Sequence, residues 1–335
     1  MKWLLAPVPS GKPWDGTTLY TSPLGGSESA VAYLARALAR IGEDVSVLGH
    51  MDPVRGPDMR EIDDVKYYPS SHLPELIGQR WDVVLSSRWR EIIQDVSWDT
   101  DTTAIWFHDM YHGDWRGFIV KLVVYLTKFH RDAWAMTEEN SNIIGNGVDL
   151  QLFDYSIERN PNKLVWISNP DRGLALAAKI FQEARKKWPD LELHVFGRAA
   201  VYGWAPEVEA PFLPRPQHME NVFLHEPVKK SVLAKELLSS WAMFYPSYWP
   251  ETYCIAALEA QAAGTPVICS PLGALNETVK GGILIPDYLN AISQLRNVNR
   301  WNKLSAAGKE FAMRSSWEQR ANEWVHLVAS SLEAK

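Results

Sequence analysis

Short apolar runs alternate with longer segments of helical periodicity along the whole chain. Runs rich in Val, Ile and Leu predict buried strands, whereas apolar residues spaced three and four apart predict one-sided helices. Continuous apolar strands joined by helices indicate parallel sheets with both faces covered, so we predict an α/β protein with two doubly wound domains. The predicted strands are residues 3–8, 45–48, 82–86, 104–107, 133–136, 164–167, 191–196, 222–224, 243–245, 267–269 and 283–285.

The helical pattern is clearest in residues 27–41, where apolar side chains share one face. Ser27 is the expected N-cap of this helix and Gly42 its expected stop. Residues 118–131 mix apolar and basic positions, which predicts an amphipathic helix with a solvated polar face; contact with an anionic membrane or with nucleic acid is the alternative. Further helices are predicted at 173–187, 231–239, 253–263 and 317–332.

The length of 335 residues corresponds to about two domains. The polar stretch 146–162, which contains Pro161 and lacks periodicity, is the predicted linker. We therefore expect a first domain over 1–155, a second over 156–315, and a C-terminal helix over 316–335, for which packing back on the first domain stays open. Ligands of doubly wound sheets bind at the carboxyl ends of the strands, so the expected site is a cleft between two such edges.

Composition narrows the class of protein. A net charge of −6, with 46% hydrophobic and 22% charged residues, is typical of a soluble globular protein and disfavours a strongly basic nucleic-acid binder. Cys254 and Cys269 are too few for a disulfide framework, which fits a reducing compartment. No apolar run approaches the length of a membrane span, and no signal-peptide cleavage site follows the start. We expect an unprocessed cytoplasmic protein.

Two glutamates in one segment are the strongest candidates for chemistry. Seven residues separate Glu251 from Glu259, which places Glu251 at the mouth of a predicted helix and Glu259 two turns further, among apolar neighbours. A carboxylate among apolar side chains is costly unless it finds donors, and vicinal ligand hydroxyls are suitable ones. The alternative is that Glu259 pairs with a lysine or arginine and Glu251 is an ordinary carboxylate at a helix start. Spacing alone leaves both open.

This segment resembles the signature of a known family. Pro250-Glu-Thr-Tyr, then Glu259-Ala, then Gly264-Thr-Pro-Val-Ile resembles the retaining glycosyltransferases of family 4, and Leu24-Gly-Gly-Ser-Glu, Asn146-Gly-Val-Asp-Leu and Asn221-Val-Phe-Leu-His match in the family's order. The resemblance implies a GT-B fold, in which two Rossmann-like domains face a central cleft. It also implies transfer of a sugar from a nucleotide diphosphate sugar to an acceptor hydroxyl, with retention of anomeric configuration.

The resemblance assigns donor-binding roles residue by residue. Glu259 would hold the ribose hydroxyls and Glu251 the donor's sugar. Backbone N–H groups at the helix start would reach the sugar and the diphosphate, since a helix N-terminus attracts anions. These N–H groups belong to the segment of Thr252, Tyr253, Cys254 and Ile255.

The diphosphate needs cations, and here the chain departs from the family pattern. The family usually has an arginine and a lysine after the first strand of the second domain, whereas this chain has Ser168-Asn169-Pro-Asp-Arg172-Gly. Arg172 takes the lysine's place, and Ser168 and Asn169 add possible donors. Lys229 and Lys230 are the candidates for the second cation, unless it is absent.

Glycine loops and a histidine complete the expected donor site. Gly25 and Gly26 precede the first long helix, where free N–H groups face an anion, and Gly273 replaces a family glycine loop near the phosphates. By resemblance, His108 lies near the donor sugar, with Asp109 as a second polar group. His108, Arg172 and Glu251 thus receive the catalytic roles, although a lone histidine at a strand end is more often structural.

The sequence constrains the acceptor, the metal and the cofactor less than it constrains the donor site. Aromatic rings stack on sugars, so an acceptor platform is expected among Trp14, Tyr20, Trp106, Tyr111 and Trp115. Neither the Asp-x-Asp pattern at 99–101 nor the pair His108 and His112 has a convincing third ligand, so we expect no metal, and no cofactor besides the donor. A UDP-sugar is the expected donor, with a GDP-sugar open.

Alternatives to a glycosyltransferase remain at this point. A nucleotide-sugar epimerase of related fold and a binding protein without turnover would both keep the nucleotide site. The expected partners are a nucleotide-sugar donor and a carbohydrate or other hydroxyl acceptor. The acceptor can be a glycan, a lipid-linked glycan, a protein or a modified DNA base. Peripheral contact with a membrane stays open, and the net negative charge of the chain disfavours binding to nucleic acid.

Overall fold

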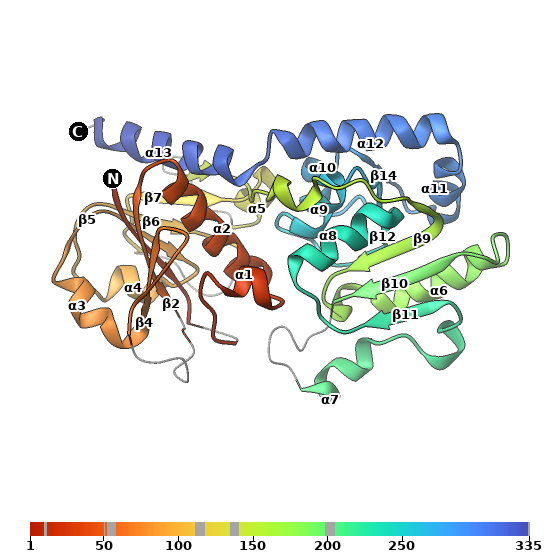
Figure 1. Ribbon diagram of the computed structural model, residues 1–335, viewed down its shortest axis with the longest axis horizontal. Coiled ribbons are helices and arrows are strands. Elements are labelled where there is room, and N and C mark those ends of the chain that lie inside the picture. The colour runs from red at the N-terminus through yellow and green to blue at the C-terminus, as the bar shows by residue number, and fades with distance from the viewer. Residues whose placement is uncertain are drawn as a thin grey trace. The chain divides into compact units, whose positions relative to one another are not determined.

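A computed structural model describes residues 1–9, 12–49, 51, 58–110, 118–134, 141–197 and 205–333 (Figure 1). The chain forms two compact units: unit 1 comprises Met1–Gly147 with Trp317–Lys335, and unit 2 comprises Val148–Ser316. Unit 2 thus begins before the expected residue 156, and the C-terminal helix belongs to unit 1. No helix in the described ranges has the length and apolar character that crossing a membrane requires.

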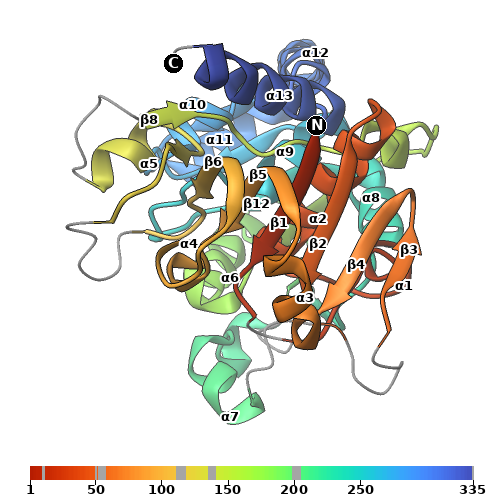
Figure 2. The same ribbon diagram turned by 90° about the vertical axis from the view of Figure 1, so that its left-hand side faces the viewer.

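In the described ranges of unit 1, eight strands form one sheet with the order β3-β4-β2-β1-β5-β6-β7-β8. All neighbours are parallel except the β3–β4 pair, and Figure 2 shows β4, β2, β1 and β5 side by side. The strands are β1 (Lys2–Pro7), β2 (Asp44–Gly49), β3 (Arg60–Ile62), β4 (Val65–Pro69), β5 (Arg80–Ser87), β6 (Asp99–Trp106), β7 (Leu122–Tyr125) and β8 (Ser141–Ile143). The helices are α1 (Thr18–Thr21), α2 (Gly26–Arg40), α3 (Leu73–Ile77), α4 (Arg90–Gln94), α5 (Lys128–Ala133) and α13 (Trp317–Glu333).

The described residues of unit 2 form a six-stranded parallel sheet with the order β11-β10-β9-β12-β13-β14. The strands are β9 (Asn160–Ile167), β10 (Glu192–Phe196), β11 (Val222–His225), β12 (Ser240–Tyr245), β13 (Val267–Cys269) and β14 (Gly282–Leu284). The helices are α6 (Leu174–Arg185), α7 (Pro206–Glu209), α8 (Lys230–Ser239), α9 (Ile255–Ala262), α10 (Leu275–Thr278), α11 (Tyr288–Leu295) and α12 (Val298–Met313). Strand order reverses between β1 and β5 in unit 1 and between β9 and β12 in unit 2, and ligands of such sheets bind beside these reversals.

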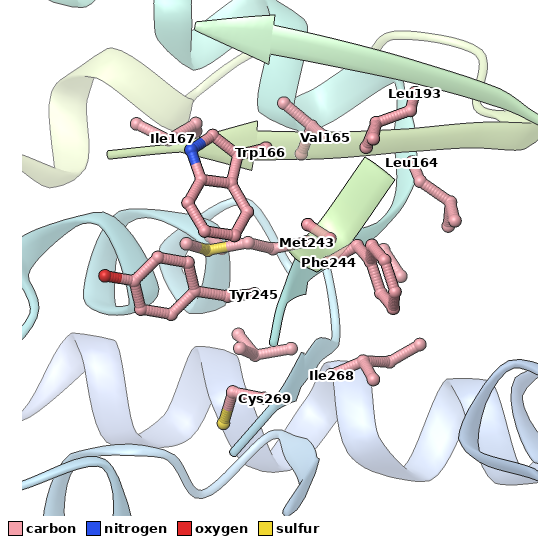
Figure 3. Close-up of a cluster of buried hydrophobic side chains, with 14 of the residues drawn as sticks. Leu164, Val165, Trp166, Ile167, Leu193, Met243, Phe244, Tyr245, Ile268 and Cys269 are labelled. Atoms are coloured by element: carbon pink, nitrogen blue, oxygen red, sulfur yellow. The ribbon is translucent and has the colours of Figure 1, made fainter. Parts of the chain in front are cut away.

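The core of unit 2 explains why its strands are apolar at consecutive positions. Figure 3 shows side chains of β9, β12 and β13 packed together, including Val165, Trp166, Phe244 and Tyr245. Neighbouring residues of one strand point to opposite faces of a sheet. Since both of each such pair are buried, both faces are covered, as the apolar runs predicted.

Three local predictions were wrong. Gly25, not Ser27, is the N-cap of α2. Residues 118–131 do not form one helix, because Leu122–Tyr125 forms β7, and a short fully buried apolar run has no periodicity that separates strand from helix. Ala133 ends α5, whose N-cap Thr127 accepts a hydrogen bond from the backbone N–H of His130, so no strand begins there; residues 135–136 lie outside the described part.

Helix α13 is an integral part of unit 1, where it lies along α2 (Figure 1). Its first residue, Trp317, stacks on Tyr33 of α2 with ring centroids 5.9 Å apart. Trp324, which is 0% exposed, meets Trp106 of β6 edge to face at 5.6 Å. These contacts place the last helix of the chain over the core formed by the first part.

We expect Trp324→Ala to lower the free energy of unfolding of unit 1 by about 3–5 kcal/mol, because it removes a fully buried indole and leaves a cavity. Urea unfolding followed by fluorescence measures the loss. His326→Ala, at an exposed position of the same helix, is the matched control and should change the free energy by less than about 0.5 kcal/mol. Equal effects of the two substitutions would show that α13 does not stabilise unit 1.

Candidate functional site

The candidate site in unit 2 begins where the chain leaves β9 and β12. After β9, the turn Pro170–Arg172 leads through Gly173 into α6. Gly173 has φ 121°, and a Cβ atom there would lie 3.0 Å from the carbonyl oxygen of Pro246, just beyond β12. Glycine is therefore required for the close approach of the two strand ends at the reversal of strand order.

An ion pair joins these strand ends. Nη1 of Arg172 lies 2.9 Å from both carboxylate oxygens of Glu251, whose side chain is buried with the residue only 4% exposed. The hydroxyl of Tyr245 also donates to Glu251, and burial followed by the charge of Glu251 raises the pKa of Tyr245, which keeps that donor protonated. Arg172 lies over the ring of Trp249, with its guanidinium carbon 5.4 Å from the centroid. Glu251 is thus a positioned carboxylate rather than an ordinary surface residue of a helix start.

Gly273 supports Glu251 from the other side. It has φ 58°, and a Cβ atom there would lie 2.8 Å from the carbonyl oxygen and 2.9 Å from the backbone nitrogen of Glu251. The next residue, Ala274, donates its backbone N–H to that same carbonyl at 2.9 Å. The structure therefore gives Gly273 a packing role against Glu251.

Helix α9 begins at Ile255, two residues later than predicted. Cys254 is its N-cap and has φ 70°, a left-handed conformation that is uncommon for residues with a side chain. Its carbonyl accepts the first hydrogen bonds of the helix, from the N–H groups of Ala257 and Leu258. The preceding Tyr253 is buried, and its carbonyl accepts from the hydroxyl of Thr278 at 2.8 Å. The turn from Glu251 into α9 is thus fixed by backbone hydrogen bonds.

Glu259 lies within α9 and is 6% exposed. Nζ of Lys230, the first residue of α8, lies 2.5 Å from its Oε1, so the pairing with a lysine that the sequence left open does occur. Its Oε2 is buried and has no hydrogen-bond partner among the described residues. Lys230 is thereby engaged at Glu259, whereas Lys229 is an exposed N-cap.

Two more acceptor oxygens near the end of β9 resemble Oε2 of Glu259. Oδ1 of Asn169 and Oδ1 of Asp171 are buried and have no hydrogen-bond partner in the described ranges. Burial raises the pKa of Asp171, and the charge of Arg172 opposes this effect. Ser168 is partnered, because its hydroxyl lies 3.2 Å from that of Tyr245. Buried acceptors without donors are unusual in native proteins and mark a place where a hydroxyl or N–H group of a ligand can bind.

In unit 1, a second group of polar residues gathers at the carboxyl ends of β1, β5 and β6. Gly25 and Gly26 start α2, whose first turn carries Glu28. Arg88 follows β5 and reaches Glu28 with Nη2 at 2.9 Å and Asp109, beyond β6, with Nη1 at 3.3 Å. No motif pointed to Arg88; its only signal was a basic residue two positions after the predicted strand 82–86.

His108 is buried next to this group and is uncharged at neutral pH. Burial, then the charge of Arg88, then His130 hold the pKa of His108 well below its ordinary value of 6.5. Its ring centroid lies 4.3 Å from that of Trp106. The carbonyl of Asp109 accepts hydrogen bonds from Nε2 of His130 at 2.7 Å and from Nε1 of Trp134 at 3.1 Å, so the chain directly after His108 is firmly held.

The expected acceptor platform is not supported where the structure describes it. Trp14 is 3% exposed and packs edge to face against Tyr67, and Trp106 is fully buried, so neither presents a free ring face. Tyr20 is exposed, but its hydroxyl bonds to Asp63 at 2.5 Å. Tyr111, His112 and Trp115 lie outside the described residues.

The Asp-x-Asp pattern has a structural partner. Asp99 and Asp101 lie at the amino end of β6, opposite the end that leads to His108, and both contact Arg80 of β5, at 3.4 and 2.6 Å. Within the described ranges, no group of three His, Cys, Asp or Glu residues is arranged to hold a metal ion.

Comparison with known proteins identifies the fold. Residues 161–298, all within unit 2, match the family model of glycosyl transferases group 1. D-inositol 3-phosphate glycosyltransferase of Segniliparus rotundus is 24% identical over 210 residues, which are 56% of this chain and 46% of that protein, so the chain spans less than half of this relative. Sucrose-phosphate synthase of Thermosynechococcus elongatus covers 100% of both chains with a TM-score of 0.74 and 17% identity. HepE of Anabaena, in complex with UDP-glucose, covers 98% of this chain and 100% of its own, with a TM-score of 0.72 and 13% identity.

These likenesses, with two parallel-sheet units, confirm the predicted GT-B fold of Rossmann-like halves. The family match over unit 2 supports a glycosyltransferase. At this level of identity the solved structures inform the fold alone.

The burial of His130 predicts a pH-dependent stability of unit 1. Its Nδ1 accepts from the backbone N–H of Leu126, so Nε2 carries the proton that it donates to Asp109, and desolvation lowers its pKa to about 4. The unfolded chain, with a histidine pKa near 6.5, binds the proton first. The free energy of unfolding should therefore fall as pH drops from about 6.5 to about 4, by about 3 kcal/mol in total for this group.

Urea unfolding at several pH values in that window measures the slope. In His130→Gln the slope should be shallower by about one proton, since glutamine does not titrate. The control is His218→Gln, which replaces a partly exposed histidine of unit 2. Equal slopes in the wild type and His130→Gln would contradict the assignment of His130 as a buried neutral histidine.

Proposed function

We propose that the protein is a retaining glycosyltransferase, which transfers a sugar from a nucleotide diphosphate sugar to an acceptor hydroxyl. The family match supports the class. The observation that carries the proposal is the pair of buried carboxylates, Glu251 and Glu259, at the strand-order reversal of unit 2; one oxygen of Glu259 has no partner in the part of the chain that the structure describes. Acceptor atoms of this kind suit the hydroxyls of a ribose and a sugar.

The donor is proposed to bind to unit 2. Oε2 of Glu259 accepts from the ribose, while Lys230 offsets the charge of that carboxylate. Glu251 accepts from hydroxyls of the transferred sugar, in an orientation that Arg172 and Tyr245 maintain. Arg172 faces the diphosphate, because its side chain is 30% exposed and is a cation beside the α9 turn.

Other donor contacts are proposed from the same positions. The amides of the turn into α9 and the side chains that follow β9 reach the phosphates and the sugar. In unit 1, the N–H groups at the start of α2 are proposed as donors to an anion. These contacts are assigned to Ser168, Asn169, Thr252, Tyr253, Cys254, Ile255, Gly25 and Gly26. UDP is the proposed nucleotide; the Anabaena neighbour was crystallised with UDP-glucose, which is consistent with this choice.

The proposed reaction needs no protein nucleophile. The bond between the anomeric carbon and the donor phosphate breaks, the acceptor oxygen bonds to that carbon on the same face, and the acceptor proton passes to the departing phosphate oxygen. Catalysis then depends on positioning and on stabilising charge at the phosphate. Uncharged His108 is proposed to orient the sugar through a hydrogen bond, Asp109 to contact the acceptor, and no divalent metal is required.

We expect Glu259→Ala to weaken UDP binding roughly 10–100-fold, because one charge-assisted hydrogen bond to the ribose, worth about 1.5–3 kcal/mol, is lost. Calorimetric titration with UDP measures the affinity. Glu310→Ala, which removes an exposed carboxylate of α12, should leave it unchanged. Unaltered UDP affinity in a folded Glu259→Ala protein would defeat the assignment.

Stereochemistry tests the mechanism. From an α-linked donor we expect an α-linked product, formed equally well with EDTA present, since the donor phosphate takes the proton on the face it leaves. Proton NMR of the first-formed product reads the configuration. His108→Ala should lose much of its turnover but keep UDP binding. A β-linked product would overturn both the retaining mechanism and the role given to His108.

A further inference from the structure

Arg88 has no role in the function proposed above, yet it occupies the strand-order reversal of unit 1. It follows β5 directly, and its backbone N–H donates to the carbonyl of Trp106 at the end of β6, 3.2 Å away. Its φ of 65° places it in the left-handed region, which residues with long side chains rarely adopt. Conformations of this kind persist where the surroundings impose them, and they gather at functional sites.

The side chain of Arg88 connects two elements that carry proposed site residues. One arm reaches Glu28 in the first turn of α2, two residues after Gly26, and the other reaches Asp109, the neighbour of His108. Arg88 and Glu28 are largely buried, with 18% and 12% of their side chains exposed. Salt screens a partly buried ion pair of this kind less than a surface ion pair. The pair therefore restricts the positions of the chain after β5 and of the first turn of α2.

We propose that Arg88 is a positioning residue, which holds the His108–Asp109 segment against the start of α2. The inference rests on the proposed function of His108. Arg88 contacts no reacting atom; it acts through the geometry and the protonation of its neighbours.

The charges around His108 come from several elements. Arg88, after β5, and His130, on α5, both disfavour the imidazolium form. Asp109 follows His108 directly, and Glu28, in the first turn of α2, binds the other arm of the same guanidinium, which compensates both carboxylates. Removing the positive charge of Arg88 takes away one of the two groups that disfavour the imidazolium form and leaves the neighbouring Asp109 without this ion pair, and both changes favour protonation of His108.

The test compares Arg88→Gln, Arg88→Lys and Arg80→Gln. Arg80 lies at the opposite end of β5 and pairs with exposed carboxylates, so it is the matched control. Three quantities are measured: kcat for transfer, UDP affinity, and the pH at which His108 titrates, from side-chain NMR and from the acid limb of kcat/KM.

Arg88→Gln should lower kcat roughly 10–100-fold, leave UDP affinity unchanged, and move the titration of His108 to higher pH. Arg88→Lys keeps the charge but not the two-armed geometry, so His108 should titrate as in the wild type while kcat falls by a smaller factor. Arg80→Gln should resemble the wild type in all three quantities.

The proposal is overturned if His108 titrates identically in Arg88→Gln and the wild type, even when kcat falls, because that pattern indicates a merely structural role. It is equally overturned if the titration moves and kcat does not. Should Arg88→Gln fail to fold, Glu28→Gln releases one arm of the guanidinium and should lower kcat in the same direction. If the wild type transfers no sugar, the proposed function is refuted instead. The NMR titration of His108 can be measured without sugar transfer, so the two outcomes can be distinguished.

Discussion

The ion pair between Arg172 and Glu251 joins two strand ends that lie 79 residues apart in the chain. A carboxylate as buried as Glu251 is stable only with a partner, so the turn after β9 and the loop after β12 have to meet in one arrangement. Gly173 and Gly273 permit that meeting, since a Cβ atom at either would collide with or crowd the opposing backbone. Tyr245 adds a hydrogen bond from the strand itself. The position of the α9 turn, and with it the proposed donor site, depends on this pair.

Unit 1 also has an arginine that pairs with carboxylates at its reversal of strand order. Its strand order also reverses, between β1 and β5, and there Arg88 connects Glu28 of α2 with Asp109 beyond β6. In each unit, then, an arginine that follows a strand of the reversal holds a carboxylate that follows another strand. Parallel sheets leave polar loops at these edges, and arginine suits the task because its planar fork binds more than one acceptor. The two halves therefore share a physical device as well as a topology.

Most of the fold and the outline of the candidate site could be predicted from local features of the sequence. Consecutive apolar residues predicted strands such as β9 and β12, and the spacing of Glu251 and Glu259 singled out the loop and helix that contain them. The helix predicted over 118–131 was wrong because Leu122–Tyr125 forms a strand, and a short buried apolar run has no periodicity that separates strand from helix. The partners of the glutamates are distant in the chain, as Lys230 and Glu259 show, so only the fold reveals them. Arg88 matched no motif, and the burial of Trp14 depends on packing that composition does not report.

Binding of a nucleotide donor to unit 2, at the reversal of strand order, is the proposal on which the roles of Glu251, Glu259 and Arg172 depend. A crystal structure of the protein with UDP tests it most directly. The ribose is expected at Oε2 of Glu259, and the diphosphate beside Arg172 and the turn into α9. Well-defined UDP elsewhere, with the carboxylates of Glu251 and Glu259 in contact with protein groups alone, would contradict it.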